Sequence, residues 1–184
     1  MRGLNVGPRH TWVSEMPRAI LLAALALLAA AAVRAAEPAL TVSSPQKTLL
    51  LSADDFGRLL RTEVVATDPH EKASHRYSGV AVRDLLASVG APLADKLRGP
   101  ALQLAVLVRS LDGYAVLYAL PEFDESFSYR TIIVADRIDG APIAGKAGPL
   151  RIIVPGDKHA ARWIRMVKSI EIIQPAGPIA PRTR

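Results

Sequence analysis

Short apolar runs separated by turn residues fill the chain from residue 39 to 173, and this pattern limits the fold more than any other feature. The runs are five to seven residues long, a length typical of strands bounded by Gly, Pro, Ser and Asp. They lie at residues 39–43, 47–51, 63–67, 102–108, 114–120, 131–135, 150–154 and 169–173. We therefore expect one α+β domain, in which a β-rich mixed sheet core carries short helices.

Two stretches depart from the strand pattern and predict helices. Ser52 can accept the N-cap bond of a short helix, because Asp54 and Asp55 follow in the first turn, where negative charge is favoured. Residues 82–90 carry an apolar stripe at helical spacing, and Gly90 ends it. Residues 68–75 are polar and contain a proline, so we expect a loop there.

The amino-terminal segment has the three-part pattern of a secretory signal. An apolar run at residues 19–33 follows Arg18 and precedes the small residues Ala35 and Ala36. This run is shorter than the roughly 20 residues that span a bilayer, so we expect a cleaved signal peptide at residues 1–36 and no stable membrane span afterwards. Met16 is a possible true start, and a retained signal anchor remains the alternative. The mature chain is then periplasmic or secreted, with a domain at 37–174 and a disordered tail at 175–184.

Composition excludes several kinds of chemistry. The chain of 184 residues contains no cysteine, which rules out disulfides, iron–sulfur clusters, zinc ribbons and a thiolate nucleophile. Positive charge is concentrated at the end, since residues 146–184 hold eight basic and two acidic residues. This favours an anionic small molecule or an acidic exported partner, although a solvated basic face remains equally open. Nucleic acid is not expected, because only 5% of the residues are aromatic and the rest of the mature chain is acidic.

Several motifs along the chain share their order and spacing with one family. They are Tyr77 to Gly90, Asp112-Gly113-Tyr114, Gly148 to Pro155, Arg162-Trp163-Ile164 and Ser169 to Ile172. In this respect the chain resembles the sulfite oxidase-type oxidoreductase molybdopterin-binding domain family. The resemblance implies an α+β fold, a molybdopterin cofactor whose pyrophosphate is held by basic and backbone groups, and redox chemistry at molybdenum.

The sequence departs from that family at one informative place. In catalytic members, a cysteine before the helix that corresponds to residues 82–90 binds molybdenum, and here that region, residues 64–75, has none. Thr67 or Asp68 lies nearest the expected position, and an oxygen ligand is harder than a thiolate. We therefore favour a small-molecule or partner binding module without redox catalysis. The alternative is a periplasmic molybdenum-pterin oxidoreductase, or its accessory subunit, with a non-cysteine ligand or with the metal held by the pterin alone.

Basic side chains provide the candidate binding residues. The segment after Gly156 can present cations and backbone N–H groups to an anion, or it can be a solvated turn; its cations are Lys158, His159, Arg162 and Arg165. The resemblance adds His75 and Arg76 as possible contacts to the cofactor. The spacing of Asp68, His70 and His75 fits no known metal motif, so no metal site is predicted. Trp163 suits the core better than a stacking face, and no catalytic residue is assigned.

Overall fold

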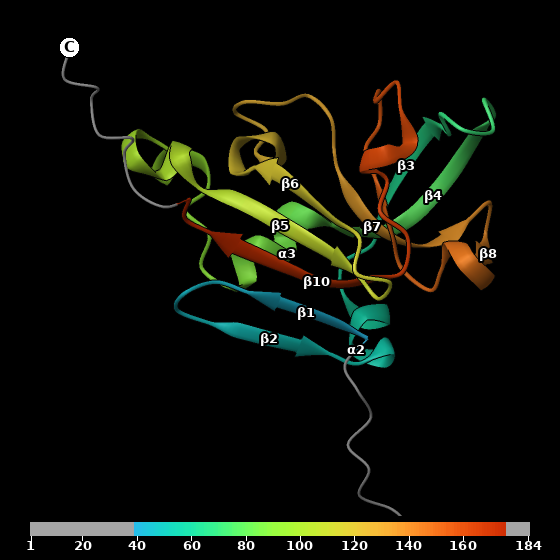
Figure 1. Ribbon diagram of the computed structural model, residues 1–184, viewed down its shortest axis with the longest axis horizontal. Helices are drawn as coiled ribbons and strands as arrows, with labels where there is room; N and C mark the ends of the chain where they lie inside the picture. Colours follow the sequence, from blue (N-terminus) through green and yellow to red (C-terminus); the bar gives the residue numbers. More distant parts are fainter. Residues whose placement is uncertain (1–38, 176–184) are drawn as a thin grey trace, which may run out of the picture. The chain divides into compact units, whose positions relative to one another are not determined.

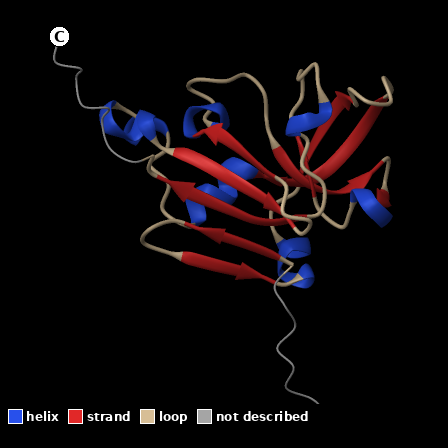
Figure 2. Cartoon of the chain, in the orientation of Figure 1, coloured by secondary structure: helices blue, strands red, loops and turns tan. Residues whose placement is uncertain are grey.

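The computed structural model describes residues 39–175, in which two five-stranded sheets are combined with short helices (Figures 1 and 2). The first sheet has the order β2-β1-β10-β5-β6. Its strands are β1 (Leu40–Ser43), β2 (Thr48–Leu51), β5 (Ala105–Ser110), β6 (Ala115–Ala119) and β10 (Val167–Ile173). Strand β10 pairs in parallel with β1 and antiparallel with β5, so the sheet is mixed, as the sequence predicted.

The second sheet has the order β3-β4-β7-β8, and β9 also pairs with β7. Its strands are β3 (Thr62–Thr67), β4 (Ser74–Ala81), β7 (Ile133–Ile138), β8 (Ala141–Pro142) and β9 (Arg151–Ile153). All pairings in this sheet are antiparallel. Gly79 sits where β4 meets β7, and a Cβ there would lie 1.9 Å from the carbonyl oxygen of Val134.

The helices are short, and both α-helices lie where the sequence placed them. Helix α2 (Ala53–Arg58) begins at the N-cap Ser52, whose hydroxyl accepts a bond of 3.1 Å from the backbone N–H of Asp55. Helix α3 is Val82–Ser88. Single 3₁₀ turns complete the connections: η1 (Ala94–Lys96), η2 (Gly99–Gln103), η3 (Leu120–Phe123), η4 (Gly145–Ala147) and η5 (Ala160–Arg162).

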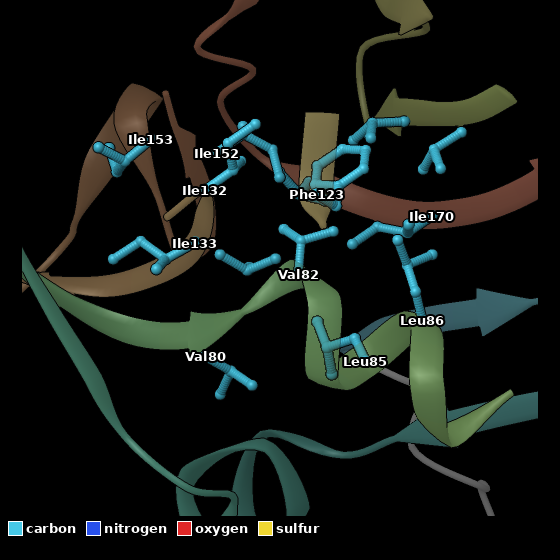
Figure 3. Close-up of a cluster of buried hydrophobic side chains, with 14 of the residues drawn as sticks. Val80, Val82, Leu85, Leu86, Phe123, Ile132, Ile133, Ile152, Ile153 and Ile170 are labelled. Carbon is cyan, nitrogen blue, oxygen red and sulfur yellow. The ribbon is translucent and has the colours of Figure 1, made fainter. Parts of the chain in front are cut away.

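One core joins helix α3 to strands of both sheets (Figure 3). The buried face of α3 consists of Val82, Leu85 and Leu86. Ile133 and Ile152 come to this core from β7 and β9, and Ile170 comes from β10. Strand β7 begins with three consecutive buried residues and β9 ends with two, which is the pattern of strands covered on both faces.

The structure differs from the sequence-based expectation in several places. Strand β4, which pairs with both β3 and β7, is not among the expected strands. The expected loop at 68–75 ends earlier, because Ser74 and His75 already belong to β4 and pair with Thr67 and Ala66 of β3. The strand expected from residue 102 begins at Ala105, because Pro100 starts the 3₁₀ turn η2 before it. The proposed signal peptide with Met16, and the tail after Pro175, lie outside the described residues. Within residues 39–175, no helix is long and apolar enough to cross a membrane.

Candidate functional site

A cleft of about 340 Å³ lies between the turn that follows β3 and the segment around η5. Its walls include Asp68, His70 and Glu71 from the turn, Arg151 from β9, and Trp163 and Arg165 from the segment after η5. A second hollow of about 290 Å³ shares Ala160, Ala161, Trp163 and Arg165 with it. The cleft is at the lower end of the volumes that hold small ligands.

Asp68 forms the floor of this cleft and is only 2% exposed. One carboxylate oxygen, Oδ1, accepts bonds from the backbone N–H groups of His70 (2.8 Å) and Glu71 (3.3 Å). The other, Oδ2, accepts a bond of 2.8 Å from Nη2 of Arg151. Burial opposes ionisation, but these donors outweigh it and hold the pKa of Asp68 below its usual range. Asp68 is therefore an ionised carboxylate with hydrogen bonds to both of its oxygens.

Arg151 is held from two sides. Its guanidinium lies 5.4 Å from the centre of the Trp163 ring, a cation–π distance, and it is paired with Asp68. Its Nε is buried and has no hydrogen-bond partner among residues 39–175. Trp163 itself is buried and donates its indole N–H to the carbonyl of Val154 at 3.0 Å. The structure thus places Trp163 in the core, as the sequence favoured, and not as an open stacking face.

Arg165 and His70 supply the open polar groups of the cleft. Both are exposed, and neither side chain makes a hydrogen bond or ion pair with another residue in the described part of the chain. The guanidinium of Arg165 therefore keeps its planar set of donors for an anion. Of the six residues predicted to bind a cofactor, Arg165 is the one that lines this cleft.

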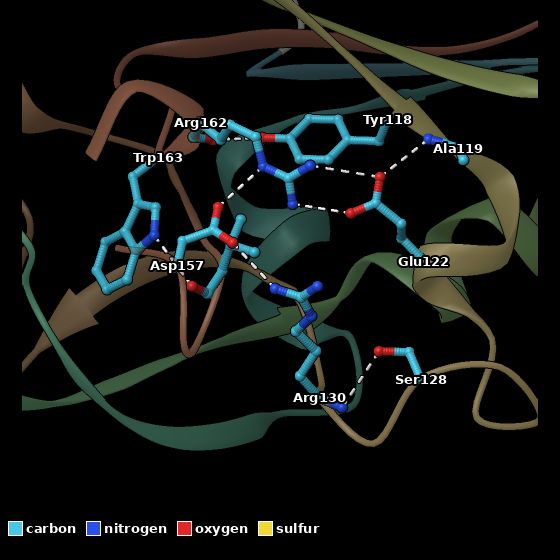
Figure 4. A network of polar contacts seen from close by, with 9 residues as sticks. Tyr118, Ala119, Glu122, Ser128, Arg130, Asp157, Arg162 and Trp163 are labelled. Atoms are coloured by element: carbon cyan, nitrogen blue, oxygen red, sulfur yellow. Dashed lines mark hydrogen bonds and ion pairs between the residues drawn. The ribbon is translucent and has the colours of Figure 1, made fainter. Parts of the chain in front are cut away.

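Arg162 is committed elsewhere, to a network of polar contacts (Figure 4). Its Nε donates to Asp157 at 2.9 Å and its Nη2 to Glu122 at 2.8 Å. The guanidinium also lies 4.9 Å from the centre of the Tyr118 ring. Burial lowers the pKa of Arg162, but the two carboxylates outweigh burial and raise it above its usual value. The structure therefore gives Arg162 a role in joining loops, with three of its five N–H donors bonded to Asp157 and Glu122, and its contact with a cofactor stays a prediction.

The other four candidates lie away from the walls of the cleft. Lys158 and His159 are exposed on the loop before η5. His75 binds Asp139 through Nδ1 at 2.7 Å and Glu71 through Nε2 at 3.2 Å, and Arg76 pairs with Glu63 at 3.1 Å.

The contacts of His75 change its titration. The hydrogen bond with Asp139 is the main cause that raises the pKa of His75, and Glu71 adds to it against the effect of burial. Because Glu71 lines the cleft, His75 is connected to it through that carboxylate. A cofactor-binding role for these four residues stays a prediction.

Arg151 is the site residue that reading the sequence missed. It lies inside the apolar run at 150–154, whose other members are aliphatic. The available signal was a single cation inside that run, because a charged side chain in a buried strand needs a partner. The partner, Asp68, is 83 residues away in the sequence.

The resemblance to molybdopterin-binding domains can be tested against these donors. Residues 39–175 contain no group of three or more His, Asp or Glu side chains arranged to hold a metal ion. The one buried carboxylate at the cleft already accepts three hydrogen bonds, and the chain has no cysteine. The described residues of the cleft therefore do not provide a side-chain ligand suited to molybdenum. Arg165 and His70 do fit a small anionic group.

Comparisons with known proteins agree with this fold. The family model described as oxidoreductase molybdopterin binding domain matches residues 39–177. The crystal structure of the sulfane dehydrogenase SoxCD from Paracoccus pantotrophus is similar, with a TM-score of 0.57 and 17% sequence identity. The match covers 74% of this chain and 38% of that chain, so this chain spans well under half the length of the protein it matches. No curated protein matches in sequence.

Proposed function

The chain belongs to the oxidoreductase molybdopterin-binding domain family, and from this premise we propose that it is an exported module that binds an anionic small molecule in the cleft between Asp68 and Arg165. In this proposal no side chain of the protein is a ligand to molybdenum. A pterin bearing a phosphate is the first ligand class to test, because the family is named for it. The protein then binds and presents its ligand without redox catalysis of its own.

The observation that carries this proposal is the distribution of charge in the cleft. Two arginines line it, and only Arg151 is neutralised by a carboxylate within bonding distance. Arg165 faces the same space without such a partner in the described structure, and the imidazole of His70 lines the same cleft. A phosphate or carboxylate can accept two parallel bonds from a guanidinium, whereas an apolar or cationic ligand leaves Arg165 unpaired.

Binding of inorganic pyrophosphate, measured by isothermal titration calorimetry at low salt, tests the anion site. We expect saturable binding that weakens about tenfold in Arg165→Gln, in line with the loss of one charged hydrogen-bonding group. Arg58→Gln is the matched control, because Arg58 is an exposed arginine of α2 that pairs only with Asp55. Equal loss in both variants, or no binding by the parent protein, would refute the proposed site.

Production in a host that synthesises molybdenum cofactor tests the cofactor itself. The purified protein is analysed for molybdenum, and for pterin through its fluorescent oxidation product. Pterin without stoichiometric metal supports the binding module. One molybdenum per chain together with visible dithiolene absorption would instead establish the alternative, a molybdenum-pterin oxidoreductase or its accessory subunit.

Export and partner binding complete the proposal. The apolar run at residues 19–33 supports export to the periplasm or outside the cell, and mass spectrometry of the mature protein checks it. We expect a chain that starts near residue 37, and a chain that still starts at Met1 or Met16 would contradict cleavage. The basic residues after position 146 support an acidic exported redox partner as a second kind of ligand.

A further inference from the structure

The turn after β3 carries the residue nearest to the position at which a metal ligand was expected. We infer that Asp68 is the fixed partner of Arg151 and not a metal ligand, so that a carboxylate–guanidinium clamp replaces metal coordination at the floor of the cleft. The inference concerns the cleft of the proposed function, but it depends on contacts within the chain and not on the identity of the ligand.

The first argument is the use of the carboxylate oxygens. Both oxygens of Asp68 accept hydrogen bonds: Oδ1 from two backbone N–H groups, and Oδ2 from Arg151. The backbone bonds hold the turn that follows β3 and fix the direction in which the carboxylate points. A metal ion bound to Oδ2 would bring a second cation against the buried guanidinium of Arg151, and one bound to Oδ1 would compete with the two backbone N–H groups that hold the turn.

The second argument is what displacement would leave behind. The Arg151 side chain is only 11% exposed, and its Nε already lacks a partner among the described residues. Without Asp68 it would be a buried cation packed against Trp163, with no carboxylate within bonding distance. A buried charge that loses its only counter-ion is among the most destabilising changes in a protein. Metal binding by Asp68 therefore opposes folding of the cleft itself.

The third argument is that no nearby group takes over as a ligand. Thr67 is exposed on β3 and pairs with Ser74, and it has a single hydroxyl to offer. The imidazole of His70 lines the cleft, but residues 39–175 provide no set of three donors around it. A metal held by side chains alone uses three or more such donors, so these residues form no site of that kind.

A double-mutant cycle measures the clamp. The variants are Asp68→Asn, Arg151→Gln and the pair together, and urea unfolding gives the equilibrium constant of each. We expect each single change to raise the unfolding equilibrium constant on the order of 100-fold. For the double variant, we expect the increase to be smaller than the product of the two single increases by at least tenfold. Coupling of less than about twofold would overturn the clamp. Arg151→Lys, which keeps the charge but loses the planar fork, provides a milder variant if a single change prevents folding.

Metal content gives a second and independent readout. The parent, Asp68→Asn and Glu71→Gln proteins are produced in a host that makes molybdenum cofactor, and molybdenum per chain is measured by elemental analysis. Glu71→Gln is the control, because Glu71 is another carboxylate of the same turn and lines the same cleft. We expect the molybdenum content of Asp68→Asn to equal that of the parent, whether this is zero or not.

A tenfold loss of molybdenum in Asp68→Asn, with the metal retained in Glu71→Gln, would show that Asp68 is a ligand and would overturn the inference. Failure of the proposed function has a different signature. If the parent binds neither pyrophosphate nor pterin, the proposed site falls, while the coupling between Asp68 and Arg151 still tests the clamp.

Discussion

Replacement of Arg162 by methionine distinguishes its structural role from the binding role that the sequence suggested. Methionine keeps the length that packs over the Tyr118 ring, but removes the cation that joins Asp157 to Glu122. Removing one partner of a fully buried ion pair costs about 3–5 kcal/mol, because the remaining charge stays buried without compensation. Arg162 is 33% exposed and Asp157 keeps Arg130, so the lower end applies, and we expect a loss of about 3 kcal/mol in the free energy of unfolding.

Urea unfolding followed by circular dichroism measures this loss, and a melting scan shows it as a fall of roughly 10 °C for a domain of this size. Arg130→Met is the matched control. Arg130 is 40% exposed and its partner Asp157 retains Arg162, so we expect a loss below about 1 kcal/mol. A loss below 1 kcal/mol for Arg162→Met, or weaker pyrophosphate binding at unchanged stability, would refute the structural role and restore Arg162 as a ligand residue.

Three further predictions test other parts of the fold. Gly79→Ala forces a Cβ against the backbone of β7, so we expect the free energy of unfolding in urea to fall by about 3 kcal/mol. Gly57→Ala in α2 is the control. Its Cβ meets no atom within 4 Å, so we expect the free energy of unfolding to rise by up to about 1 kcal/mol. Ser52→Ala removes the N-cap and should cost about 1 kcal/mol in the same assay; no change would contradict the cap. The pKa of His75 is raised in the folded protein, so the stability that protonated His75 contributes is complete below its unfolded pKa of about 6.5. That contribution is lost as pH rises through the folded pKa. The free energy of unfolding measured against pH should show this loss in the parent and not in His75→Gln.

Local signals were sufficient for most elements of the fold. The N-cap at Ser52 and the apolar stripe of α3 were readable because both depend on residues within one or two helical turns. The reversal between β5 and β6 is local as well, since Gly113 adopts a positive φ of 89° there. The start of β4 was not readable, because His75 and Arg76 favour no strand by themselves and are held by pairing with β3.

The site was harder to predict than the fold, because its decisive contacts join residues that are distant in sequence. Cations were correctly expected after Gly156, but which of them is free depends on acidic residues elsewhere in the chain. Arg162 is occupied by Glu122, 40 residues away, while Arg165 meets no such partner in the described structure. A sequence pattern gives the charges of a segment, whereas the fold decides which of these charges are already neutralised.

The same reasoning explains how a chain without cysteine can keep the fold of a molybdopterin-binding domain. The cleft between β3, β9 and the segment after η5 is closed by contacts within the protein, namely Asp68 with Arg151 and Trp163 with Val154. These contacts involve no metal, so the loss of a metal ligand removes none of them. Arg165 at the rim remains available to an anion whatever the chemistry at the floor. The contacts that hold this cleft are therefore independent of a metal, so the proposed anion site can be tested separately from metal chemistry.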